Sequence, residues 1–330
     1  MKDAILRLTD FSSYFPKKII SNKDIVEEMG SALNPLIIDR AVGSKNRRVA
    51  THGEMSSDML SVVGLDLLRK SGLKQSNIGR LICSADPMDQ AAPDTSVIAQ
   101  NKIGLKCAAH GVSMSCVGWI CGISNAIGVL NSTEISNIMV LASSTVGSKF
   151  FFENPMHRSI FGDGSGGVII SSDSDQGAEI LGIDICTFGQ FHSDIYGPLS
   201  WSDVPAVIPD KFKKTFYMNI DNRVYFDALD KYVKPFYFDL LKRSSICVDD
   251  ISRFIVHQAS MPIFEHTLKS FGIPSSKTAN YYKDYGNTIS AELPSVAHLE
   301  LECGNIKQGD IVMFLTYGAG FTGGAMIVKF

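Results

Sequence analysis

The chain has 330 residues and a formal net charge of −3, with 45% hydrophobic and 20% charged residues. This composition is typical of a globular protein with one large domain or two smaller ones, and it excludes an overall basic field that would favour nucleic acid or an anionic membrane. Seven scattered cysteines without C-x-x-C spacing argue against a disulfide scaffold and against a structural zinc site.

In the first half of the chain, short apolar runs alternate with helical periodicity, as in α/β proteins. The expected strands cover residues 5–11, 80–84, 138–142 and 166–171, and a further strand runs from about 108 towards Cys116. The expected helices begin at 21–22, span 55–71 and 93–104, and run from beyond Cys116 to about 130. No secretory signal is evident at the first residues, and no apolar run approaches the roughly 18 residues that cross a bilayer. We therefore expect reduced thiols and a cytoplasmic protein.

The second half begins with an irregular, proline-containing stretch over 187–218, which is either a loop over a site or a linker between halves. A second α/β series follows. It consists of a helix over 224–242 bent at Pro235, a strand over 254–256, a helix over 263–271, and a hairpin of strands over 311–315 and 325–328. Each half therefore contains a strand-to-helix junction of similar style, one at Cys116 and one at His257.

Cys116 lies where an extended segment turns directly into a helix rich in small residues. The unpaired N–H groups and the positive dipole end of a helix N-terminus favour a thiolate, which is the nucleophilic form of cysteine. A buried structural cysteine is the alternative. His257 ends an apolar strand, at the sheet edge where ligands bind to parallel sheets, and a structural histidine is its alternative. Asn287 enters a helix, where it is otherwise simply an N-cap.

Six short motifs favour the catalytic interpretation of Cys116, His257 and Asn287 over the structural one. In chain order they are residues 12–16 (SSYFP), 42–48 (VGSKNRR), 161–166 (FGDGSG), 257–260 (HQAS), 286–288 (GNT) and 317–324 (YGAGFTGG). Together with Cys116 they resemble the β-ketoacyl-acyl-carrier-protein synthase III family of the thiolase superfamily, over essentially the whole chain. The resemblance implies a five-layer α-β-α-β-α sandwich built from two duplicated βαβαβαββ halves, here residues 1–175 and 176–330. It also implies a homodimer.

The resemblance assigns the catalytic roles to Cys116, His257 and Asn287. Cys116 would accept an acyl group from a coenzyme A or acyl-carrier-protein thioester. His257 and Asn287 would then stabilise the enolate formed when a malonyl thioester loses carbon dioxide. The backbone N–H groups of Cys116 and Ala319 would bind the oxyanion of the following condensation. No metal and no cofactor other than the thioester substrates is implied.

The resemblance also implies a set of substrate-binding residues: Arg40, Ala92, Trp119, Asn222, Gln258, Ser260, Gly318, Gly320 and Phe321. Several positions depart from the family pattern. Leu36 replaces a tryptophan that stacks on adenine, Pro262 replaces an arginine that docks the carrier protein, and Trp119 and Ala92 change the acyl tunnel in opposite directions. These departures favour a specialised member, in fatty acid or polyketide and secondary metabolism. Two alternatives stay open: acyl transfer to an oxygen or nitrogen nucleophile without decarboxylation, and a non-catalytic partner subunit.

Overall fold

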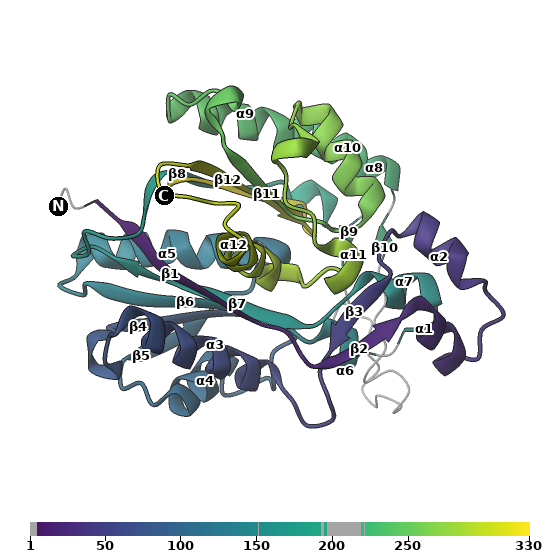
Figure 1. Ribbon diagram of the computed structural model, residues 1–330, viewed down its shortest axis with the longest axis horizontal. Coiled ribbons are helices and arrows are strands. Elements are labelled where there is room, and N and C mark those ends of the chain that lie inside the picture. Colours follow the sequence, from purple (N-terminus) through teal and green to yellow (C-terminus); the bar gives the residue numbers. More distant parts are fainter. Residues whose placement is uncertain (1–4, 151, 193–194, 197–218, 221) are drawn as a thin grey trace.

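The computed structural model describes residues 5–150, 152–192, 195–196, 219–220 and 222–330 (Figure 1). Most of the irregular stretch predicted over 187–218 therefore lies outside the described residues. All seven cysteines are free thiols. Within the described ranges, none of the helices combines the length and the apolar character needed to cross a membrane.

A nine-stranded sheet in the order β11-β12-β13-β8-β1-β7-β6-β4-β5 forms the framework. Its strands are β1 (Arg7–Tyr14), β4 (Arg80–Asp86), β5 (Ala108–Gly111), β6 (Asn137–Ser144), β7 (Gly164–Ser171), β8 (Ala178–Thr187), β11 (Arg253–Val256), β12 (Ile311–Gly318) and β13 (Thr322–Lys329). Strands β1 and β8 pair over only two residue pairs, at the N-terminal ends of both strands. Beyond this short joint they diverge, so that the sheet opens into two sheets that face each other (Figure 1).

Helices fill three layers around the two sheets (Figure 1). The outer layers are α3 (Ser56–Ser71) and α4 (Thr95–Ile103) on one side, and α8 (Asn222–Ala228), α9 (Lys234–Arg243) and α10 (Met261–Phe271) on the other. The central layer is α5 (Gly118–Ser132) and α12 (Glu292–Glu302). Strands β6 and β7 are buried along their whole length, as expected for strands covered on both faces. The predicted five-layer α-β-α-β-α sandwich is therefore confirmed.

The two sheets have matching strand orders, which supports the predicted duplication. The first runs β1-β7-β6-β4-β5 and the second β8-β13-β12-β11, where a bridge from Phe254 to Thr278 stands in place of a fifth strand. The division at residues 175 and 176 stays a prediction, and it falls in the turn between β7 and β8. The remaining elements are β2 (Lys18–Ser21), β3 (Asn46–Val49), β9 (Ile195–Tyr196), β10 (Asn219–Ile220), α1 (Asn22–Glu28), α2 (Pro35–Ala41), α6 (Val146–Lys149), α7 (Pro155–Ile160) and α11 (Tyr282–Tyr285).

Local signals placed most helix ends correctly. Ser21 caps α1 with a full capping box, and Asp94 caps α4. Gly72 and Gly104 end α3 and α4 with φ angles of 69° and 82°. The bend predicted near Pro235 takes the form of a π-helical turn over Leu229–Val233, between α8 and α9. Since proline has no N–H to donate to the preceding turn, the helix widens there.

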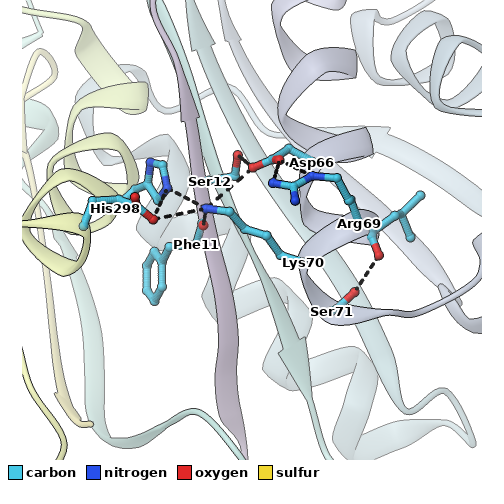
Figure 2. A network of polar contacts seen from close by, with 9 residues as sticks. Phe11, Ser12, Asp66, Arg69, Lys70, Ser71 and His298 are labelled. Carbon is cyan, nitrogen blue, oxygen red and sulfur yellow. Dashed lines mark hydrogen bonds and ion pairs between the residues drawn. The ribbon is translucent and has the colours of Figure 1, made fainter.

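A polar network ties the outer helix α3 and the central helix α12 to β1 (Figure 2). Lys70 Nζ lies 2.6 Å from His298 Nε2 and donates to the Phe11 carbonyl. Because the ammonium can only donate, His298 accepts through Nε2 and carries its proton on Nδ1, which lies 2.8 Å from Ser13 Oγ. Burial lowers the pKa of His298 below its ordinary value of 6.5, and Lys70 lowers it further, against the opposing charges of Glu302 and Asp66. The neutral imidazole is therefore the form that fits the folded state.

This linkage predicts how pH affects folding. The unfolded state binds a proton at His298 more readily than the folded state, so stability from this residue falls as pH drops through 6.5 towards the lower folded pKa. Lys70→Met removes the neighbouring cation, and the free energy of unfolding should therefore fall less steeply as the pH drops below 6.5. The same change lowers stability at alkaline pH, because the contacts of Lys70 are lost. Urea unfolding on both sides of pH 6.5 measures this, with the exposed Lys74→Met as control. An unchanged pH slope in Lys70→Met would show that the network does not set the protonation of His298.

Candidate active site

Cys116 lies in a single 3-10 turn, Ser115–Val117, that leads directly into α5. Ser115, the residue before it, has a φ of 43°, in the left-handed region that serine rarely adopts. The strand predicted to run up to Cys116 ends at Gly111, because this sharp reversal cannot continue a sheet ladder. The Thr316 hydroxyl donates to the Cys116 carbonyl at 2.9 Å. The half-buried thiol is thus held at the start of a central helix, where the sequence predicted it.

An apolar cluster packs beside Cys116. Its members are Val146, Phe152, Phe161 and Ile289, with Phe150 and Ile160 at its edge. They come from α6, α7, the segment before β7 and the turn before α12. The thiol therefore faces an apolar wall that suits the hydrocarbon part of an acyl group.

His257 follows β11 and is fully buried. Its backbone N–H donates to the Leu315 carbonyl of β12 at 2.8 Å, and its carbonyl accepts from the Tyr317 hydroxyl at 3.0 Å. The Tyr317 ring lies edge-on to the imidazole, with centroids 5.8 Å apart. These contacts fix the imidazole at the carboxyl ends of two parallel strands, as the sequence predicted.

A carboxylate absent from the predicted set lies against His257. The Oε2 atom of Glu292 is 2.6 Å from His257 Nδ1, although the approach is not aligned as a hydrogen bond, and we describe the contact as an ion pair. Burial alone would lower the pKa of His257, but the negative charges of Cys116 and Glu292 outweigh it and raise the pKa to about 10. A pKa of about 10 favours the charged imidazole at neutral pH, with Cys116 on one side and the carboxylate of Glu292 on the other.

Asn287 is also buried, at 4% exposure, and it makes the cap-like contact that the sequence offered as an alternative, while its role towards an enolate stays a prediction. Its backbone is clamped to the segment before β7: its N–H donates to the Ile160 carbonyl at 2.8 Å and its carbonyl accepts from Gly162. Its side-chain oxygen accepts from the Ile289 N–H at 2.7 Å, as a cap does. With the oxygen engaged in this way, the amide group presents its N–H donors, which is the form an enolate oxygen needs.

The glycine-rich segment between β12 and β13 approaches the thiol closely. A Cβ atom on Gly318 would lie 3.2 Å from Cys116 Sγ and 3.1 Å from its Cβ. Gly320 has a φ of 125°, which L side chains rarely adopt. Phe321 is buried and exchanges backbone hydrogen bonds with Phe188. Ala319 lies in the middle of this segment, and the oxyanion role of its N–H stays a prediction.

Two predicted substrate-binding residues lie in the interior. Trp119 is 1% exposed and packs between Phe11 and Phe314, at ring distances of 6.4 and 5.6 Å. The Gln258 side chain accepts from the N–H groups of Tyr281 and Tyr282 and donates to the Ala279 carbonyl. Both residues therefore have a structural role, and their contact with substrate stays a prediction.

The other predicted binding residues lie further out. Arg40 is exposed in the last turn of α2, and Ala92 is exposed in the loop before α4. Ser260 is half-buried directly before α10. Asn222 is the first residue of α8, and its side chain lies outside the described residues. The structure brings Cys116, His257 and the glycine-rich segment together, and leaves Arg40 and Ala92 on the surface.

Glu292 is the residue beside His257 that sequence reasoning missed. As the first residue of α12 it reads as an ordinary acid that favours a helix N-terminus. The signal that marks it is its setting: it is one acid within the small and apolar run Ser290-Ala291-Glu292-Leu293-Pro294, all of it buried. Within the described ranges, histidine, cysteine, aspartate and glutamate side chains form no group of three or more that could hold a metal ion.

Comparison with known proteins identifies the family of this chain. Residues 111–189 match the family model 3-oxoacyl-(acyl-carrier-protein) synthase III, and residues 241–330 match the model of its C-terminal part. The β-ketoacyl-(acyl-carrier-protein) synthase III of Clostridium perfringens strain SM101 is 26% identical over 330 residues, 98% of each chain. That of Aliarcobacter butzleri is 27% identical over 320 residues, 96% of each chain.

Solved structures share the fold over nearly the whole chain. The 3-oxoacyl-(acyl-carrier-protein) synthase III of Aquifex aeolicus has a TM-score of 0.86 at 22% identity, covering 98% of this chain and all of the other. A variant of OleA from Xanthomonas campestris has a TM-score of 0.87 at 19% identity, covering 99% and 98%. The chain belongs to the β-ketoacyl-acyl-carrier-protein synthase III family of the thiolase superfamily.

Proposed function

We propose that this chain catalyses a decarboxylating Claisen condensation. Cys116 takes an acyl group from a coenzyme A or carrier-protein thioester, and the acyl-cysteine then reacts with a malonyl thioester to give a β-keto product. The setting is fatty acid or specialised polyketide synthesis. The observation that supports this function best is the position of His257, buried beside Cys116 with its Nδ1 2.6 Å from Glu292 Oε2, which together raise its pKa to about 10.

Acylation uses the thiolate directly. The sulfur attacks the thioester carbonyl, an S–C bond forms, and the leaving thiolate takes a proton from the imidazolium. In the second half-reaction the malonyl carboxylate leaves as carbon dioxide, and negative charge develops on the thioester oxygen. Two donors suit that oxygen: the Nε2–H of His257 and the amide of Asn287. The carbanion then attacks the acyl-cysteine, whose oxyanion is bound by the N–H groups of Cys116 and Ala319.

The charge on His257 favours condensation over acyl transfer to an oxygen or nitrogen nucleophile. Such a transfer needs a general base to take a proton from the acceptor after Cys116 is acylated, and an imidazole that is protonated again beside Glu292 at that stage has no free lone pair to do so. An oxyanion, in contrast, is stabilised better by a charged donor than by a neutral one. A non-catalytic partner subunit has no need of a nucleophile, and this chain retains Cys116 at the start of a central helix with its polar partners in place.

The first prediction concerns the nucleophile. Cys116→Ala should lower the release of carbon dioxide and β-keto product by about a thousandfold or more, because the covalent intermediate is lost. Mass spectrometry should find the acyl adduct on the Cys116 peptide and not on that of Cys121, a half-buried thiol of α5 whose pKa is raised by burial. Cys121→Ala serves as the matched control with full activity. Undiminished product formation by Cys116→Ala would rule out the covalent mechanism.

The second prediction concerns the space around the thiol. Gly318→Ala places a methyl group 3.1–3.2 Å from the side chain of Cys116, which is tighter than ordinary contact. The thiol must shift, and acylation should slow on the order of a hundredfold, as small displacements of reacting groups do. The control is Gly128→Ala, in an exposed part of α5 with nothing within 4 Å, which should stabilise the protein by up to about 1 kcal/mol. Wild-type acylation rates in Gly318→Ala would contradict the close approach.

A further inference from the structure

We propose that Glu292 is a positioning residue that keeps His257 doubly protonated in both half-reactions, so that a charged Nε2–H faces the malonyl thioester after Cys116 has lost its own charge. This inference rests on the proposed condensation and adds a fourth residue to its site. It starts from the contact between Glu292 and the far side of the imidazole, with Oε2 2.6 Å from Nδ1.

The surroundings of Glu292 hold its carboxylate in one orientation. The residue is 4% exposed, and its Oε1 accepts from the Gln258 backbone N–H at 2.9 Å. Gln258 is the residue after His257, so one carboxylate binds both the backbone and the ring of the same turn. Its other oxygen, Oε2, has His257 as its ionic partner. A buried carboxylate in contact with an imidazole is stabilised by keeping that imidazole charged.

The groups that face His257 come from three elements. They are Cys116 from the turn before α5, Glu292 from α12 and Tyr317 from β12. The Tyr317 hydroxyl is turned away, towards the His257 carbonyl and Thr267, and burial raises its pKa. Burial raises the pKa of the neighbouring Tyr282, and the negative charge of Glu292 raises it further. Both phenols therefore stay neutral, and the charge of the imidazole depends on Cys116 and Glu292.

The proton balance of the reaction shows why the second anion matters. In acylation, the leaving thiolate removes the Nε2 proton, and Cys116 becomes a neutral thioester. The neutral ring keeps its proton on Nδ1, against Glu292, and Nε2 is then a bare lone pair that cannot donate. Only the charge of Glu292 remains to draw a proton from solvent back to Nε2. The overall reaction consumes one proton, and this step is where the enzyme takes it up.

The condensation half-reaction then proceeds without further proton transfer. Carbon dioxide leaves, the enolate oxygen accepts from the charged Nε2–H, and the carbanion attacks the acyl-cysteine. The C–S bond breaks and returns Cys116 as a thiolate beside the imidazolium. Without Glu292, the ring would pass through this stage with no nearby anion, and burial would favour its neutral form.

Nitrogen NMR of ¹⁵N-histidine-labelled protein tests this without any substrate. Cys116→Ala removes the thiolate and mimics its loss of charge, so only Glu292 faces the ring. We expect both nitrogens of His257 to remain protonated well above the ordinary value of 6.5. Cys116→Ala combined with Glu292→Gln should show a neutral ring, with one bare nitrogen, near pH 7. The resonances are assigned with His257→Gln.

Two further variants distinguish the effect of the Glu292 charge from a structural effect of the substitution. Glu292→Asp keeps the carboxylate and should restore part of the double protonation. Glu302→Gln makes the same change at the exposed end of α12 and should leave the His257 signals unmoved. In the protein that retains Cys116, Glu292→Gln should slow the condensation half-reaction about a hundredfold, since loss of one oxyanion donor costs about 10²- to 10³-fold.

A neutral His257 at pH 7 in Cys116→Ala, with Glu292 intact, would overturn the proposal. So would an unchanged doubly protonated ring in the Cys116→Ala/Glu292→Gln protein. The NMR spectra are recorded without substrate, so they do not depend on the result of the condensation assay. The proposed reaction and the role of Glu292 are therefore tested independently.

Discussion

A buried imidazole held between a cysteine and a carboxylate is the constraint on which this site depends. His257 is fully enclosed, and the burial that would neutralise it is offset only because Cys116 and Glu292 lie on either side. Both partners of His257 stand at the start of a central helix, Cys116 before α5 and Glu292 at the first turn of α12. The positive end of each helix dipole therefore favours negative charge at these two positions. The duplicated halves, packed face to face, bring those two helix starts together.

The elements that the sequence predicted well are those specified by short-range chemistry. Ser21, Asp94, Gly72 and Gly104 mark helix ends through their own side chains or their tolerance of positive φ, without help from distant residues. Cys116 belongs to the same class, because a strand that turns into a helix is readable along the chain. The end of β5 was not readable, since it is set by the reversal at Ser115 and by pairing with β4.

The residues that the sequence could not fully interpret are those whose contacts come from long-range packing. Glu292 looks like a helix-end acid until the fold turns it towards His257. Gln258 is predicted to contact substrate, which stays a prediction, and the structure adds that its side chain joins three backbone groups of the segment 279–282. Two of the motifs that carried the family resemblance also join distant parts of the backbone. Arg47 is buried and donates to the Ser159 carbonyl, and Asp163 accepts from the Ala50 N–H.

In the proposed reaction, the two sides of Cys116 would serve opposite needs. On one side, the apolar cluster around Phe161 and Ile289 would keep water from the acyl-cysteine, which a free water molecule would hydrolyse, and from the carbanion, which it would protonate. On the other side, the enolate needs a strong donor, and in a site with little water an imidazolium is stronger than any neutral group. An apolar pocket alone would leave His257 neutral. The carboxylate of Glu292 supplies the charge that lets a dry acyl site and a charged donor share one sulfur atom.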